Sequence, residues 1–323
     1  MKNVFLTSVM ALFCLINFVN CSDNKYPDNL TTNNPNKVET LTTLSKQIDS
    51  LGYKYSKEYK TRGILRQMFD IVSADVFGAQ LGKAAGGALG GVIGGLSGGH
   101  IGAAAGAATG ATYGRWIGAG IGSAIVAFDA NIVNIPRNKD SNTDICVSQG
   151  PKSIEDSIGL FHNQVMRRIF ENRSAYIKKD GEVDKNKIYD DCVKFYADLG
   201  VVADSLSKGE KRNYKQTILR YADESVKISK AYREGSISAE QLFDYQMDVA
   251  KKYSIMTERD IELYLSVTKN IILQCCGIER EYIEEYAKDV NHTISESDLP
   301  NIEKSILAES AQIAINSRLC WQE

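Results

Sequence analysis

The hydrophobic and polar positions of this chain follow a helical pattern over most of its length. After Lys152, apolar residues recur at spacings of three and four, and short runs of turn residues interrupt them. Alternation with a period of two, which a half-buried strand needs, is absent from this part of the sequence. Ser238 and Gln241 have the spacing of a capping box, which marks the start of one helix. The pattern predicts an all-α, multi-helix bundle with helices over residues 153–173, 185–206, 210–234, 239–252, 258–276, 278–290 and 299–321.

A second pattern, between residues 78 and 122, is a glycine at every fourth position. A period of four is close to the helical repeat of 3.6, so the small residues form one stripe along a helix. Bulky residues, among them Leu89, Ile93 and Ile101, stand three positions after glycines and form another stripe. Helices with such a glycine stripe pack with their backbones in close contact, most often in membranes. The sequence therefore predicts a glycine-zipper helical hairpin over residues 78–128, with its turn at residues 97–100. The expected helix-packing positions are Gly78, Gly82, Gly86, Gly90, Gly94, Gly98, Gly102, Gly106, Gly110, Gly114, Gly118 and Gly122.

The glycine hairpin needs a surface to pack on, because each glycine inside a helix costs about 1 kcal/mol relative to alanine. Between Val76 and Phe128 the only formal charges are Lys83 and Arg115, each fifteen residues from the predicted turn. At 1.5 Å per residue, both cations lie about 22 Å from the tip. We expect the tip to enter a membrane, with Lys83, Arg115 and Trp116 at the membrane interface. A hairpin buried in a helical bundle and a disordered Gly/Ala segment are the alternatives.

The N-terminus has the pattern of an export signal. Lys2 precedes an apolar run that ends shortly before Cys21. A cysteine directly after such a run, followed by small polar and acidic residues, resembles the signal of a bacterial lipoprotein. The resemblance implies removal of residues 1–20 and lipidation of Cys21, and it places the protein in the cell envelope as an outer-membrane lipoprotein. Phe18 and Asn20 differ from the residues usual before that cysteine, so simple secretion and an uncleaved anchor remain alternatives.

The other boundaries follow from composition. Residues 21–50 are rich in polar residues and are expected to form a flexible tether. Residues 51–77 carry apolar positions at helical spacing and predict an amphipathic helix. Residues 129–151 contain proline, glycine and asparagine and predict a linker before an all-helical domain at residues 152–323.

Charge says little about partners. The 323 residues carry a formal net charge of −2, with an isoelectric point near 6.0, which gives no reason to expect nucleic acid. Residues 151–323 hold 25 basic and 30 acidic residues, whereas residues 1–150 hold 13 and 10. The mildly basic part of the chain is therefore the part that contains the membrane-like segment.

No constellation for catalysis or metal binding stands out in the sequence. The three histidines, His100, His162 and His292, are far apart along the chain, and no cluster of metal-ligand residues is visible. The acidic stretch at residues 180–184 lacks the ligand spacing of a calcium loop and predicts a charged turn. We therefore expect no metal, no cofactor and no enzyme activity. Both long-range disulfides and buried free thiols remain open for the cysteines after Cys21, which are Cys146, Cys192, Cys275, Cys276 and Cys320.

Two resemblances add to these expectations. Residues 157–163, with the sequence SIGLFHN, and the terminal SRLCW of residues 317–321 resemble a loose set of uncharacterised exported proteins from Bacteroidota. The register from Gly78 to Gly122 is similar to glycine-zipper segments of bacterial envelope lipoproteins and of some peptide bacteriocins. Neither group carries catalytic residues that transfer to this chain.

These observations predict an exported, lipid-anchored envelope protein. Its hairpin is expected to associate with or insert into membrane lipid, or to form a homo-oligomer through the glycine face, and its helical domain is expected to bind an unknown protein partner. A bacteriocin-like effector that permeabilises membranes is the alternative from a different functional class. An envelope hydrolase is a third hypothesis, which the missing catalytic residues disfavour.

Overall fold

The computed structural model describes residues 35–55, 62–132, 158–200, 208–253 and 258–321. Within these ranges the chain is helical, and the only extended pairing is an isolated bridge between Ile177 and Val183. The all-α class predicted from the sequence is confirmed. In chain order the elements are α2 (Pro35–Tyr55), α3 (Arg62–Asp129), α4 (Ile158–Glu171), η3 (Arg173–Tyr176), α5 (Lys185–Asp198), α6 (Lys208–Arg233), α7 (Ala239–Tyr253), α8 (Glu258–Gly277), η4 (Arg280–Tyr282), α9 (Ile283–Glu296) and α10 (Asn301–Trp321).

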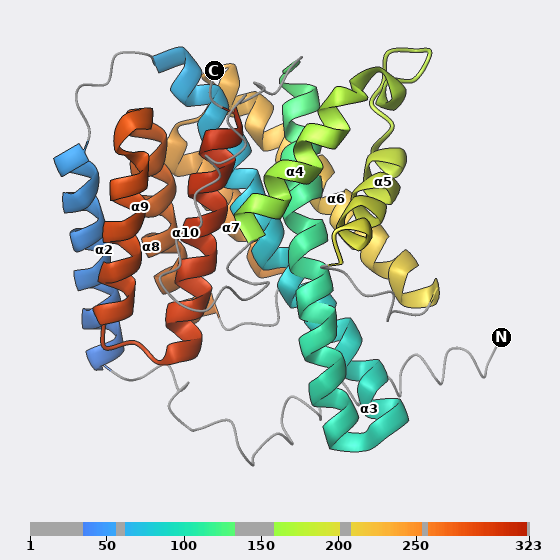
Figure 1. Cartoon of the computed structure of the whole chain (residues 1–323), viewed down its shortest axis with the longest axis horizontal. Coiled ribbons are helices and arrows are strands. Elements are labelled where there is room, and N and C mark those ends of the chain that lie inside the picture. The colour runs from blue at the N-terminus through green and yellow to red at the C-terminus, as the bar shows by residue number, and fades with distance from the viewer. Residues whose placement is uncertain (1–34, 56–61, 133–157, 201–207, 254–257, 322–323) are drawn as a thin grey trace.

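Helix α3 is the centre of the bundle, and it doubles back on itself. Gly78 and Gly118 are in backbone contact, although a straight helix would separate them by about 60 Å. We call residues 62–86 the first arm and residues 110–129 the second arm. Figure 1 shows both arms within the bundle, while the reversal of α3 projects beyond the other helices. The turn predicted at residues 97–100 lies in this projecting part, for which the structure describes no side chains.

The arms of α3 share one hydrophobic core with the helices that follow them. α3 packs most extensively on α6 and also contacts α4, α5, α7, α8 and α10. Phe77 of the first arm meets Phe243 of α7, and Trp116 of the second arm lies between Phe161 of α4 and Tyr196 of α5. Residues 78–128 and 152–323, which the sequence separates into two units, therefore form one packed body in their described parts.

The expected flexible tether needs a correction at its C-terminal end. Residues 35–50 belong to α2, whose side chains Leu41, Leu44 and Ile48 are fully buried against the bundle. Their spacing of three and four places them on one helix face, which packs on α8 and α9. The polar residues between them make the segment hydrophilic on average, and this average hides the apolar stripe. Residues 1–34, which include the expected signal and Cys21, lie outside the described chain.

The later helices begin and end near the predicted positions, except at α5 and α9. Helix α9 covers Ile283–Glu296 instead of the predicted residues 278–290. The capping box is present. Gln241 donates its backbone N–H to Ser238 Oγ at 3.2 Å, and the backbone N–H of Ser238 donates to Gln241 Oε1 at 2.8 Å. The helix predicted to reach residue 206 ends instead at Asp198, because Gly200 adopts a left-handed conformation with φ of 73° and terminates it. The expected charged turn at residues 180–184 is also present, and Gly181 has φ of 86° there.

Arg233, the last residue of α6, links the two arms at their base, which is the end far from the reversal of α3. Its guanidinium lies 2.5 Å from Asp70 of the first arm and forms a second ion pair with Asp129 of the second arm. Asp70 is fully buried, and this burial raises the pKa of its carboxyl to about 7 although the Arg233 charge opposes the shift. The arms are thus joined at their base through a carboxyl that titrates near neutrality.

We expect the Asp70→Asn variant to have a weaker dependence of stability on pH between about pH 4 and pH 7. The raised pKa means that folded Asp70 holds a proton that the unfolded chain has already released, so its contribution to stability falls as the pH rises through this interval. The shift from 3.8 to about 7 corresponds to about 4 kcal/mol. Urea unfolding at several pH values measures the slope. The exposed Glu279, changed to Gln, gives the effect of removing a surface carboxyl, and an equal change of slope in both variants would contradict the assignment.

Candidate functional site

The distinctive surface of this fold is the contact between the two arms of α3, where glycine faces glycine. Gly78 lies against Gly118, Gly82 against Gly114, and Gly86 against Gly110, which is a constant antiparallel register. A Cβ on Gly78, Gly82, Gly86, Gly114 or Gly118 would come closer than 3 Å to the carbonyl oxygen across the contact. Gly122 meets the carbonyl of Ala74 in the same way. The expected positions between Gly90 and Gly106 lie in the projecting part, where their contacts are not described and their packing role stays a prediction.

Tyrosines of α6 cover the glycine contact from one side. Tyr214 donates its hydroxyl hydrogen to the carbonyl of Gly114 at 2.6 Å, and Tyr221 donates to the carbonyl of Ala74 at 3.4 Å. Both side chains are fully buried. A helix carbonyl with no side chain beside it is open to such an additional hydrogen bond. The sequence analysis did not identify these residues, although their spacing of seven, with Ile218 between them, marks one buried helix face.

Lys83 and Arg115 lie at the same height on the two arms and share one carboxylate. Lys83 Nζ is 3.2 Å from Glu309 Oε2, and Arg115 Nη1 is 2.5 Å from Glu309 Oε1. The Arg115 side chain is 4% exposed, that of Glu309 12% and that of Lys83 36%, so only the lysine reaches the surface substantially. Glu309 belongs to α10, which therefore contacts both arms at this height.

Trp116 does not occupy the interfacial position expected from the sequence. Its side chain is fully buried, with ring centroids 5.7 Å from Phe161 and 5.6 Å from Tyr196. Trp116 follows Arg115 on the same helix, but the side of the arm on which it lies is covered by α4 and α5. The neighbouring arginine pairs with Glu309, and the tryptophan belongs to the core.

A buried polar cluster lies further toward the base of the arms. His162 Nε2 of α4 is 3.3 Å from Asp75 Oδ1 of the first arm and 3.0 Å from Ser123 Oγ of the second arm. Asp75 also accepts a hydrogen bond from Ser317 of α10, and Asn163 Oδ1 lies 3.2 Å from His162 Nδ1. Serine, histidine and aspartate are the residues of a hydrolytic triad, but a triad places the serine and the aspartate on opposite ring nitrogens. Here both lie at Nε2 and all three residues are fully buried, so the cluster does not have the geometry of a nucleophilic site.

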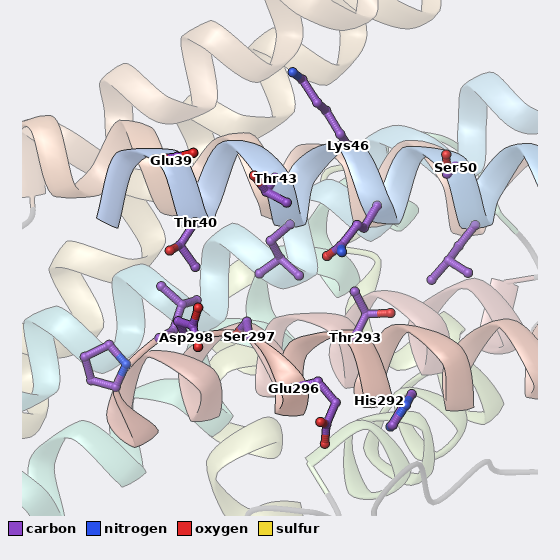
Figure 2. Close-up of a pocket in the computed structure, with 15 residues that line it drawn as sticks. Glu39, Thr40, Thr43, Lys46, Ser50, His292, Thr293, Glu296, Ser297 and Asp298 are labelled. Carbon is purple, nitrogen blue, oxygen red and sulfur yellow. The ribbon is translucent and has the colours of Figure 1, made fainter. Parts of the chain in front are cut away.

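A groove lies between α2 and the C-terminal end of α9 (Figure 2). It encloses about 1280 Å³ and continues along the connection from α9 to α10. Its walls are mostly hydroxyl, amide and carboxylate side chains, with Leu44 and Leu299 beneath them. Thr293 faces the space between the helices, whereas Lys46 extends away from it. The acidic side chains of the lining are Glu39, Glu296 and Asp298.

The cysteine and metal expectations are tested only within the described ranges. Cys192, Cys275, Cys276 and Cys320 are buried free thiols there, and Cys146 lies outside these ranges. The same ranges contain no group of three or more histidine, cysteine or carboxylate side chains that could hold a metal ion. None of the helices described combines the length and the hydropathy that crossing a membrane requires.

Comparison with known proteins adds no family or neighbour to this geometry. Neither protein-family models, nor curated proteins, nor solved structures give a match to the chain. The resemblances to exported Bacteroidota proteins and to glycine-zipper segments therefore rest on the sequence motifs alone. Any function has to be argued from the residues of this chain.

Replacing Gly114 with alanine should destabilise the fold by about 1–3 kcal/mol, the usual cost of overpacking a filled interior. The added Cβ overlaps the carbonyl oxygen of Gly82, which is backbone and cannot rotate away. Gly209→Ala is the matched control, because a Cβ at this exposed position in α6 meets nothing within 4 Å. It should leave stability unchanged or raise it by up to about 1 kcal/mol through helix propensity. Urea denaturation compares the two, and equal effects would mean that the arms are not in contact at Gly114.

Proposed function

We propose that this protein is an exported, lipid-anchored protein of the bacterial envelope that presents a glycine-zipper hairpin to a membrane. The observation that carries the proposal is the projecting part of α3. Figure 1 shows it extending beyond the bundle, and the sequence from residue 84 to residue 114 contains no charged residue. A projecting helical segment without charge is unusual for a surface that faces only water.

The dimensions of the projecting part suit immersion in one side of a bilayer. About fifteen residues separate Lys83, and likewise Arg115, from the predicted turn of α3. At 1.5 Å per residue this is about 22 Å of helix on each side. This length is shorter than a hydrocarbon core of about 30 Å. A hairpin of this size satisfies its backbone hydrogen bonds within its own helices and needs no crossing of the membrane. Leu89, Ile93 and Ile101 supply apolar side chains in this segment.

The buried arms prepare the hairpin for this role. The glycine contacts and the Glu309 ion pairs hold the arms together inside the bundle before the projecting part meets any partner. The cost of bringing two helices together is therefore met during folding, and the tip enters a membrane as a preformed pair. The glycines between Gly90 and Gly106 continue the same stripe, so a second copy of the chain can pack on them in the membrane.

The proposed lipid on Cys21 is compatible with this arrangement. Fourteen peptide steps separate Cys21 from Pro35 at the start of α2, and such a segment spans about 45 Å when fully extended. Lipid and hairpin can therefore engage the same bilayer. For the proposed partner-binding role of the body, the support is the groove between α2 and α9, whose polar walls and volume suit a hydrated ligand or a peptide segment (Figure 2).

Introducing two glutamates at the tip should abolish membrane association by the hairpin. The tip variant is Ile93→Glu with Ile101→Glu, because a carboxylate in hydrocarbon is strongly unfavourable. The matched control is Tyr53→Glu with Tyr245→Glu, which adds the same charge at the two exposed large hydrophobic residues of the described body. Flotation with vesicles of phosphatidylethanolamine and phosphatidylglycerol measures binding of the unlipidated chain. The tip variant should lose at least tenfold in bound fraction while the control binds like the parent chain.

A Cys21→Ala variant in cells separates the two proposed anchors. With the lipid absent and the tip intact, carbonate extraction should release part of the protein, and adding the tip variant should release all of it. Full release by Cys21→Ala alone would assign membrane binding to the lipid and remove the hairpin from the proposal. If vesicles that bind the parent chain also release an entrapped dye, the result would instead favour the membrane-permeabilising effector.

A further inference from the structure

The buried cluster around His162 joins four segments that are far apart in the sequence. Asp75 comes from the first arm of α3, Ser123 from the second arm, His162 from α4 and Ser317 from α10. All four are fully buried. The function proposed above makes no use of this cluster, and its cost in desolvation requires a separate explanation.

The partners of the two ring nitrogens determine the protonation state of His162. Nδ1 faces Asn163 Oδ1 at 3.2 Å. The orientation of that amide is fixed, because Asn163 Nδ2 donates to the carbonyl of Asn316 at 2.9 Å. Nε2 faces the Asp75 carboxylate at 3.3 Å. Nε2 also lies 3.0 Å from Ser123 Oγ, whose hydroxyl can donate to a neutral ring. In that neutral form the Asp75 carboxylate has no hydrogen to accept from the ring, whereas the imidazolium donates from Nδ1 to Asn163 and carries a hydrogen on Nε2 toward Asp75.

Among the titratable groups around the cluster, Asp75 is the one whose charge compensates the His162 imidazolium. Tyr196 of α5 and Tyr221 of α6 face Asp75, and burial raises the pKa of both phenols, which keeps them neutral. Burial likewise raises the pKa of the Cys192 thiol, which faces Tyr196. From α10 the facing groups are Ser317, which is neutral, and the Cys320 thiol near Tyr196. Met166 of α4 contributes only its sulfur, at 3.1 Å from Ser123 Oγ.

We propose that His162 is a pH-sensitive latch whose imidazolium holds both arms of α3 to α4 and α10. Loss of the proton from Nε2 leaves the Asp75 carboxylate buried without a cation. The contacts from α4 and α10 to the base of the arms then weaken. The latch is closed below the folded-state pKa of His162 and opens as the pH rises above it.

The direction of the pKa shift agrees with this geometry. Burial alone lowers the pKa of His162, but the charge of Asp75 and the hydrogen bonds to Asp75 and Asn163 outweigh it and raise the pKa above 6.5. A raised pKa means that the stabilisation is complete below the unfolded-state value of 6.5 and is lost as the pH rises through the folded-state value. The His162 window begins at 6.5, whereas most of the Asp70 window, from 3.8 to about 7, lies below that value.

Nitrogen-15 NMR of the imidazole rings in the full chain tests the protonation state directly. The chain has three histidines, so His100→Gln and His292→Gln variants assign the His162 signals. We expect His162 to titrate above pH 6.5, with both ring nitrogens carrying hydrogen at that pH. A neutral tautomer at this pH, or titration at or below pH 6.5, would overturn the proposal.

Thermal unfolding tests the consequence for the fold. The melting temperature of the parent chain should fall by several degrees between pH 7 and pH 9.5 relative to His162→Gln, which carries no ionisable ring. Parallel melting curves of the two proteins over this range would contradict the latch. If the glutamine variant does not fold, Asp75→Asn gives the same information, because removal of the carboxylate should lower the pH at which the His162 NMR signals titrate. An unchanged titration in Asp75→Asn would also sink the proposal.

Discussion

The backbone contact between the two arms of α3 is the constraint on which the rest of this structure depends. At Gly78, Gly82 and Gly114 the carbonyl oxygen of one arm occupies the place that a Cβ would take on the other. Glycine in a helix is unfavourable by about 1 kcal/mol per residue, so the arms are poor helices by themselves. The surrounding helices offset this cost by burying Trp116 and other large side chains, and the Tyr214 hydroxyl gives one glycine carbonyl a second hydrogen bond.

A glycine repeat of constant period has a weakness, because sliding the arms by four residues restores nearly the same contact. Three polar links at different heights remove this ambiguity. Arg233 binds Asp70 and Asp129, His162 binds Asp75 and Ser123, and Glu309 binds Lys83 and Arg115. The residues of each link are specific to one register, and a slip by one glycine step would leave charges buried without partners. Buried polar groups that fix register in this way are known from helical coiled coils.

The sequence predicts the local features of this fold well and its long-range contacts poorly. Helical periodicity indicates the all-α class, the capping box at Ser238 and the glycine stripe, because each depends on residues a few positions apart. The equal height of Lys83 and Arg115 also follows from counting residues. Their shared partner Glu309 lies 226 residues from Lys83, and no local pattern marks it. Trp116 shows this limit of sequence reasoning most clearly. The period of four predicts that a helix face is packed, but it does not tell whether lipid or protein covers the neighbouring side chains.

The polar links end at Lys83 and Arg115, but the glycine repeat continues beyond them. Between the base of the arms and this height, every step of the arms lies within two or three helical turns of a polar link, and α4, α5, α6, α7, α8 and α10 pack on α3. From this height toward the turn, the sequence keeps the small-residue stripe while it omits charge, and the reversal of α3 projects beyond the other helices. A stripe needed only for packing inside the bundle would have no reason to extend so far, since each additional glycine weakens the helix. The extension is explained if the glycines between Gly90 and Gly106 pack against a membrane or a second copy of the chain. The buried arms would then fix the distance and register of the two helices before they meet that partner.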